Sequence, residues 1–216
     1  MFSTRAFIRR ALRFAARARS LGTPRAWRRG VAGAALLAAC AWPAWAAADI
    51  EGVRFDEAVR LAGYELPLNG TGLRSFFMIK GYVAGLYLPE RAKNAAVILG
   101  MKGPKRLQIH PLRDVGADTF IHALVDGIHR NQTEAQVRKL ADRLRQLEDA
   151  MRKIGATRRG DTINVDYTPQ AGTVLSVNGV ARGRPIPGED FYQAVLRIFI
   201  GDDPVDRDLK SGLLGT

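Results

Sequence analysis

Cysteine and histidine are scarce in this chain of 216 residues. There is one cysteine, Cys40, and there are three histidines, His110, His122 and His129. A single thiol excludes a disulfide framework within the chain and the cysteine-rich zinc clusters. His122 and His129 are seven residues apart on an expected helix, which is too far for one metal ion to bridge readily. We therefore expect neither a metal site nor a cofactor.

Acidic residues are missing from the first 47 positions, which carry nine arginines. The whole chain has 33 lysines and arginines against 21 acidic residues, a net charge of +12. Removing those nine arginines leaves 24 basic residues against 21 acidic ones, a net charge of +3. An excess this small removes the electrostatic argument for a nucleic-acid partner.

Long apolar runs are also lacking. The apolar stretch at residues 31–42 is about a dozen residues long, whereas a membrane-spanning helix needs about 20. An arginine-rich start, a short apolar run and the small residues of Ala44-Trp45-Ala46 form the pattern of a secretory signal peptide. The alternative is an amphipathic helix of the folded domain, but the arginines follow no single helical face. We predict cleavage after Ala46 or Ala47.

The expected signal peptide covers residues 1–47 and leaves residues 48–216 as one domain in the periplasm, with no membrane span. Its export route stays open, because Arg28-Arg29 is similar to a twin-arginine signal. Leu37-Ala38-Ala39-Cys40 resembles a lipoprotein motif, in which Cys40 would carry a lipid anchor. The apolar residues 41–48 favour ordinary cleavage, since a lipoprotein tether is usually polar. A mature chain without Cys40 has no thiol chemistry.

The mature region alternates between strand and helix patterns. The apolar residues predict strands over residues 65–68, 75–88, 105–111, 161–167, 173–177 and 180–186. We expect a turn at Asn69–Gly72 and a type I′ hairpin at Asn178-Gly179. Helices are expected over residues 119–131, from the capping box Thr133-x-x-Gln136 to Ile154, over 190–200 and from Pro204 to Leu214. Separate runs of strands and helices predict an α+β domain with an antiparallel sheet and helices on one side.

The second of these helices has a clear apolar stripe. The residues that share this face are Val137, Leu140, Leu144, Leu147, Met151 and Ile154. We expect this face to pack against the core of the domain.

Arg74 is the candidate functional residue that the local sequence singles out. It follows the glycine-rich segment 69–72 and starts an aromatic-rich strand that carries Tyr82. A guanidinium beside a phenol can bind a carboxylate or enolate, because arginine contacts planar anions with two N–H groups. The alternative is a surface arginine in an ion pair at the sheet edge.

Residues 69–88, NGTGLRSFFMIKGYVAGLYL, resemble the signature of the chalcone isomerase-like family. That signature is Gly-x-Gly-x-Arg followed by a strand that ends in Gly-x-Tyr-Leu. Residues 172–179 and 191–215 are similar to the hairpin and closing helices of the same family, so the resemblance covers about residues 50–215. It implies an open-faced sandwich, in which a curved antiparallel sheet carries helices on one face and a ligand cleft lies between them.

The resemblance implies one of two functions. Plant chalcone isomerases close a chalcone ring by intramolecular addition, whereas related fatty-acid-binding proteins hold a fatty acid in the same cleft without catalysis. Arg74 matches the arginine that both share, and Tyr82 stands where the plant enzymes have a threonine that polarises the substrate carbonyl. The lysine and tyrosine of the plant enzymes are replaced here by Ile109 or His110 and by Phe120. These replacements would remove much of the stabilisation of an enolate.

We therefore expect a periplasmic protein that binds a small apolar carboxylate, such as a fatty acid, without catalysis. Arg74, Tyr82 and Phe120 would contact the ligand. One alternative is an isomerase, an intramolecular lyase in which Arg74 stabilises a developing enolate and His110 or Asn131 supplies a second polar group. The other is an envelope interaction module whose cleft is closed by its own side chains. An apolar pocket of roughly a few hundred Å³ with Arg74 at its floor would favour ligand binding.

Overall fold

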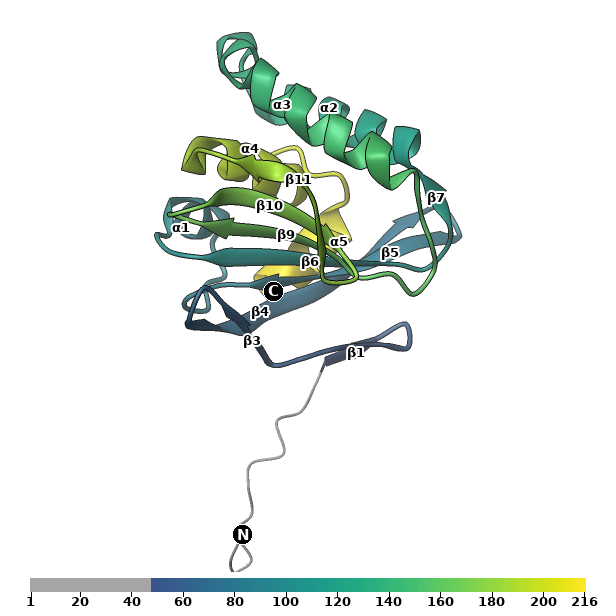
Figure 1. The fold of residues 1–216 in the computed structure, drawn as a ribbon. Helices are drawn as coiled ribbons and strands as arrows, with labels where there is room; N and C mark the ends of the chain where they lie inside the picture. The colour runs from purple at the N-terminus through teal and green to yellow at the C-terminus, as the bar shows by residue number, and fades with distance from the viewer. Residues whose placement is uncertain (1–47) are drawn as a thin grey trace, which may run out of the picture. The chain divides into compact units, whose positions relative to one another are not determined.

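The computed structural model describes residues 48–216, so the expected signal peptide and Cys40 lie outside the described residues. A curved antiparallel sheet of seven strands runs in the order β11-β10-β9-β6-β5-β4-β3 (Figure 1). These strands are β3 (Ala58–Leu61), β4 (Tyr64–Phe76), β5 (Ile79–Tyr87), β6 (Lys105–Pro111), β9 (Ile163–Thr168), β10 (Gly172–Val177) and β11 (Val180–Ile186). Two small antiparallel pairs join β1 (Ala48–Ile50) to β2 (Val53–Phe55) and β7 (Val115–Gly116) to β8 (Ala156–Thr157).

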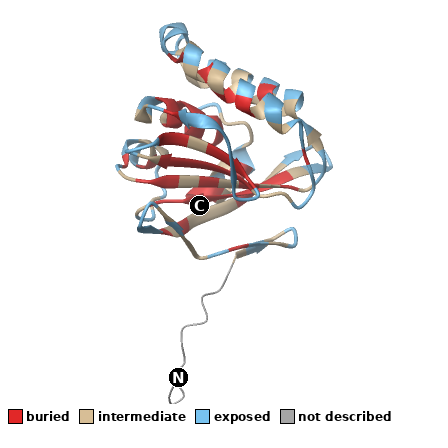
Figure 2. Cartoon of the chain, viewed as in Figure 1, coloured by how far each residue is buried: buried red, intermediate tan, exposed pale blue. Residues whose placement is uncertain are grey.

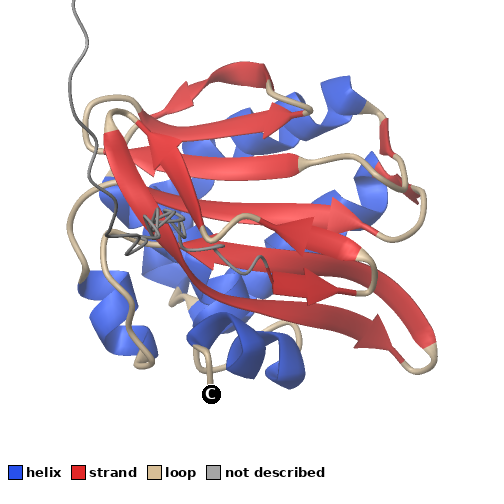
Figure 3. Ribbon diagram, turned by 90° about the horizontal axis from the view of Figure 1, so that it is seen from below, coloured by secondary structure: helices blue, strands red, loops and turns tan. Residues whose placement is uncertain are grey.

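Five helices complete the described region. They are α1 (Ala95–Gly100), α2 (Ala117–Asn131), α3 (Glu134–Ile154), α4 (Glu189–Ile200) and α5 (Arg207–Leu214). Over residues 48–216, none of them has the length and apolar character needed to cross a membrane. Figure 3 shows the helices lying behind the sheet.

The two faces of the sheet carry two separate apolar clusters. Tyr82, Ala84 and Leu86 of β5 belong to the large cluster, to which every helix contributes buried side chains. Val83 and Tyr87 belong to a smaller cluster with residues of β2 and β4. Successive side chains of a strand point to opposite faces, which explains this separation. The predicted α+β fold with helices gathered on one side is therefore confirmed.

The glycine-rich segment expected as a turn is instead the middle of β4. A Cβ atom on Gly70 would lie 2.2 Å from the carbonyl oxygen of Gly212, and one on Gly72 would lie 2.7 Å from that of Leu209. These glycines allow α5 to pack its backbone against the sheet. The turn comes later, at Phe77-Met78, and divides the single strand that we expected over residues 75–88.

The predicted α3 helix and its stripe are confirmed. The Thr133 amide donates to Gln136 Oε1 at 2.8 Å, and the Gln136 amide donates to Thr133 Oγ1 at 3.3 Å, which completes the capping box. Leu140, Leu144 and Leu147 are buried, and the remaining stripe residues pack partly buried against the same core. The Asn178-Gly179 hairpin is also confirmed, with φ of 52° and 77° at its two turn residues.

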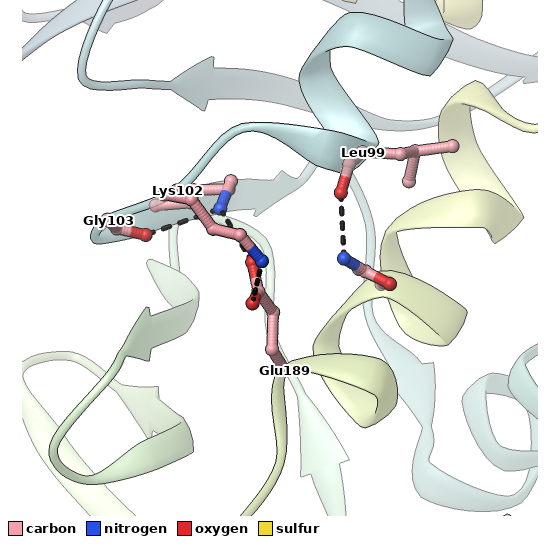
Figure 4. A network of polar contacts seen from close by, with 6 residues as sticks. Leu99, Lys102, Gly103 and Glu189 are labelled. Atoms are coloured by element: carbon pink, nitrogen blue, oxygen red, sulfur yellow. Dashed lines mark hydrogen bonds and ion pairs between the residues drawn. The ribbon is translucent and has the colours of Figure 1, made fainter.

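A polar network with one buried lysine lies where β6 and α4 begin (Figure 4). Lys105 is 1 % exposed, and its Nζ donates to the Gly103 carbonyl at 3.2 Å and lies 3.9 Å from Glu189 Oε1. Lys102 Nζ contacts the other carboxylate oxygen of Glu189 at 2.7 Å. Burial lowers the pKa of Lys105, and the Glu189 carboxylate opposes this shift. The network fixes α4 against the sheet, at the end of β6 that lies away from Tyr82.

Candidate functional site

An apolar cavity of about 100 Å³ lies between the helix-covered face of the sheet and helices α2, α3 and α4. The sheet contributes Ile109, Ile163, Val165, Leu175 and Val177 to its walls, and the helices contribute Phe120, Leu124, Leu147, Met151, Val195, Ile198 and Phe199. Of the lining side chains, only those of Arg74, Tyr82 and Thr157 carry polar groups. A ligand held here would have a largely apolar body and a polar group directed at Arg74.

Arg74 reaches the cavity because of the side-chain alternation along β4. Gly70 and Gly72 face α5, so Arg74, two residues further along, faces the helix-covered side as well. Its guanidinium carbon lies 5.6 Å from the centre of the Tyr82 ring, its partner across β4 and β5. No carboxylate of residues 48–216 forms an ion pair with Arg74. The arginine is half-buried and not engaged in the edge ion pair of the alternative interpretation.

Tyr82 is buried beside Arg74. Burial raises the pKa of the Tyr82 hydroxyl. The positive charge of Arg74 lowers this pKa, and the negative charge of Asp206 raises it, but both effects are smaller than that of burial. The phenol therefore stays protonated at neutral pH and can donate a hydrogen bond. Asp206 is occupied elsewhere, because its oxygens accept from the Leu209 amide at 2.9 Å and the Ser75 amide at 3.3 Å.

Phe120 and Thr157 complete this end of the cavity. The Phe120 ring lies 6.4 Å from the Tyr82 ring, at 34° between the ring planes, so the predicted trio of Arg74, Tyr82 and Phe120 is brought together. Thr157 was not predicted, because it lies in a two-residue strand without any periodic pattern. Its hydroxyl donates to the Val115 carbonyl at 3.3 Å, so it serves mainly to join β7 to β8.

His110 lies on the opposite face of the sheet. Its neighbour Ile109 lines the cavity, so alternation turns the imidazole towards Phe55, whose ring centre is 5.1 Å away. Its ring nitrogens contact Gln108 Oε1 at 3.2 Å and Thr162 Oγ1 at 3.4 Å. Burial lowers the pKa of His110. The structure thus places Ile109, not His110, on the cavity side.

Asn131 is also away from Arg74. Its amide nitrogen donates to the Gly127 carbonyl at 2.9 Å and the Asp203 carbonyl at 2.7 Å, and its oxygen accepts from the Asp203 amide at 3.1 Å. These bonds hold the end of α2 against the loop between α4 and α5. The residue borders a separate, more polar groove of about 700 Å³. Neither His110 nor Asn131 supplies a second polar group beside Arg74.

The histidines of α2 form no metal site. His122 and His129 are both exposed, and residues 48–216 contain no group of three His, Cys, Asp or Glu side chains placed to hold a metal ion.

The cavity is smaller than the few hundred Å³ that we expected. Pockets for drug-sized ligands measure about 300–1,000 Å³, whereas an engineered cavity of about 150 Å³ accommodates benzene. A volume of about 100 Å³ suits a short chain or small ring. A longer acyl chain needs more space than this cavity has.

Comparisons with known proteins agree with this geometry. The chalcone isomerase-like family model matches residues 47–215. The chain is similar to the crystal structure of a fatty-acid binding protein from Arabidopsis thaliana, with a TM-score of 0.59 and 14% sequence identity. The match covers 76% of this chain and 92% of the Arabidopsis chain. At this identity the likeness shows the fold alone. No curated protein matches the chain. The family match spans almost all of the described residues, and the chain therefore belongs to the chalcone isomerase-like family.

Proposed function

We propose that the protein binds a small apolar carboxylate, such as a fatty acid, in this cavity and does not transform it. The supporting observation is Arg74, whose guanidinium borders an otherwise apolar cavity and pairs with no carboxylate of residues 48–216. Arginine binds a carboxylate through two parallel hydrogen bonds. Tyr82 donates a further hydrogen bond, and the acyl chain lies among the aliphatic side chains of the helices.

Binding is favoured over isomerisation by the groups around Arg74. Enolate chemistry needs polar groups that stabilise the developing charge and transfer a proton. The other polar side chains of the lining are Tyr82, whose pKa is raised by burial, and Thr157, which already donates to Val115. Ligand binding is also favoured over the closed-cleft module, because a cavity of about 100 Å³ remains between the helices and the sheet.

Native mass spectrometry of the protein purified from the periplasmic fraction tests this proposal. We expect a co-purified apolar acid on the wild-type protein and its loss in Arg74→Ala. Arg60→Ala is the matched control, because Arg60 is an exposed strand arginine that does not line the cavity. Ala123→Phe should also abolish binding, since the added ring fills the space beside Phe120. Equal ligand occupancy in wild type and Arg74→Ala would contradict the proposal.

The periplasmic location is part of the same proposal and is supported by the signal pattern in residues 1–47. The intact mass of the mature protein tests it. A chain that starts at Ala47 or Ala48 is the expected result. A chain that starts at an acylated Cys40 would show a lipoprotein, and an uncleaved chain in the cytoplasm would exclude export.

A further inference from the structure

The tip of the β4–β5 hairpin exposes four consecutive apolar side chains. Phe76 is 68 % exposed, Phe77 88 %, Met78 96 % and Ile79 51 %. The other exposed large apolar residues of the described chain stand singly, as Tyr64, Val97 and Val180. Single exposed apolar residues are ordinary, whereas a cluster of them marks an interaction site. We call these four residues the apolar tip.

The turn of the apolar tip places a bulky aromatic residue where the other two-residue turns of the described chain have Glu51, Ala62 and Asn178. Phe76 pairs with Ile79, so Phe77 and Met78 form a two-residue turn. Phe77 has a φ of 53°, in the left-handed region that glycine and asparagine adopt at low cost and a bulky aromatic residue does not. The Phe76 and Phe77 rings pack edge to face, 4.8 Å apart between centres. A turn that only reversed the chain would not require an exposed aromatic residue in this conformation.

The apolar tip lies at the end of the sheet where the ligand cavity has its polar group. Arg74 is two residues before Phe76 on β4, and its cross-strand partner Tyr82 is three residues after Ile79 on β5. The cavity is lined at this end by the start of α2 and the end of α3. Figure 1 shows the start of β5 on the same side of the molecule as β7, which leads into α2.

The groups around the apolar tip are mixed in charge. Lys80 pairs with Glu51 at 2.6 Å, and the Leu112 amide donates to the Gly81 carbonyl at 2.9 Å, which brings exposed Arg113 to the same edge. The neighbouring loop adds Arg158 and Arg159, and also Asp114 and Asp161. Asp206, which accepts from the Ser75 amide at 3.3 Å, lies here as well, so four basic and four acidic residues balance one another. Insertion of apolar side chains, rather than charge attraction, would therefore dominate any binding here.

We propose that the apolar tip inserts into a lipid bilayer and that the protein takes up or releases its apolar acid there. Exposed aromatic and aliphatic side chains partition into the boundary between headgroups and acyl chains, and flanking Lys80 and Arg113 can extend towards phosphates. The four residues of the apolar tip are far fewer than the roughly 20–30 that each partner contributes to a stable protein interface. Docking itself does not depend on the ligand, whereas the uptake role rests on the proposed function.

Tryptophan fluorescence gives a direct test, because all three tryptophans of the chain lie before residue 48. In the mature protein, Met78→Trp creates a single reporter at the apolar tip, and Val180→Trp is the matched control beside a different two-residue hairpin turn. With vesicles of phosphatidylethanolamine and phosphatidylglycerol, we expect a blue shift and quenching by brominated lipids for Met78→Trp only. Vesicles of phosphatidylcholine should give a similar shift.

Vesicle flotation of the mature wild-type protein supplies a second measurement. Phe77→Ser with Met78→Ser should lower the bound fraction roughly tenfold or more, whereas Val180→Ser should leave it unchanged. No blue shift with either vesicle, or equal shifts at both positions, would overturn the proposal. A concentration-dependent shift without lipid would overturn it in favour of self-association through the apolar tip.

Arg74→Ala separates the two proposals. It should lose the ligand and still float with vesicles, since Arg74 is not part of the apolar tip. Flotation without ligand binding in the wild type would therefore contradict only the proposed function. Ligand binding without flotation would contradict only the membrane inference.

Discussion

At the residue scale, Gly70, Gly72 and Arg74 lie at alternate positions of β4 and so share one face of the strand. All three face the helices, where the glycines admit the backbone of α5 and the arginine faces the cavity. The spacing Gly-x-Gly-x-Arg thus combines a packing requirement with a ligand-binding group. This explains why the motif does not form the turn that its glycines suggest.

The Tyr82 hydroxyl should contribute modestly to ligand affinity. Tyr82→Phe keeps the buried ring and removes one hydrogen-bond donor, so we expect a loss of about 0.5–1.5 kcal/mol, or roughly twofold to tenfold in Kd. Isothermal titration with a fatty acid measures this change. Tyr64→Phe is the control, because Tyr64 is exposed. Unchanged affinity in Tyr82→Phe would show that the ligand does not reach this hydroxyl.

Part of the site could be predicted from residue patterns alone. Arg74 and Tyr82 share a face because of strand alternation, and Phe120 belongs to the apolar stripe of α2. The choice between Ile109 and His110 could not be made, since a shift of one residue reverses the face of a strand. Asn131 could not be placed either, because its partner Asp203 follows far along the chain, after α4.

At the scale of elements, long periodic segments were predicted well, whereas short elements and a close approach between backbones were not. The β6, β9, β10 and β11 strands and the α2, α3 and α4 helices occur close to their expected positions. The short strands β1, β2, β3, β7 and β8 and the helix α1 were missed, because two to six residues are too few for periodicity to show. Gly70 was misread, since a glycine in a strand can mark a turn or a close approach.

Gly70→Ala should destabilise the packing of α5 on β4. The added Cβ would lie 2.2 Å from the Gly212 carbonyl oxygen, and backbone must move to relieve the contact. We expect the free energy of unfolding to fall by about 1–3 kcal/mol, measured by urea denaturation. Gly100→Ala is the matched control, because no atom lies within 4 Å of its added Cβ. Equal stability of the two variants would refute the close-packing explanation.

At the scale of the whole molecule, buried tyrosines should make the protein sensitive to alkali. Burial raises the pKa of Tyr82, Tyr87 and Tyr192, so these phenols keep their protons in the folded state while the unfolded chain loses them near pH 10. The unfolded state then binds fewer protons, and stability falls as the pH rises above about 10. Below that pH all phenols are protonated in both states, and this effect is absent.

Tyr192→Phe checks the alkaline effect. The Tyr192 hydroxyl is buried and has no hydrogen-bond partner among residues 48–216, so its removal should leave stability at pH 7 nearly unchanged. At pH 11 the variant should lose less of its free energy of unfolding than the wild type does. An identical pH dependence for both proteins would show that Tyr192 titrates normally.

The central claim is that Arg74 recognises a carboxylate at an apolar cavity. Isothermal titration of the delipidated mature protein with a short-chain fatty acid and with its methyl ester tests it most directly. We predict that the acid binds roughly 10–100-fold more tightly than the ester to the wild type and to Arg60→Ala, because a charged hydrogen bond contributes about 1.5–3 kcal/mol. In Arg74→Ala the preference should disappear. Equal binding of acid and ester to the wild type, or an undiminished preference in Arg74→Ala, would contradict the account.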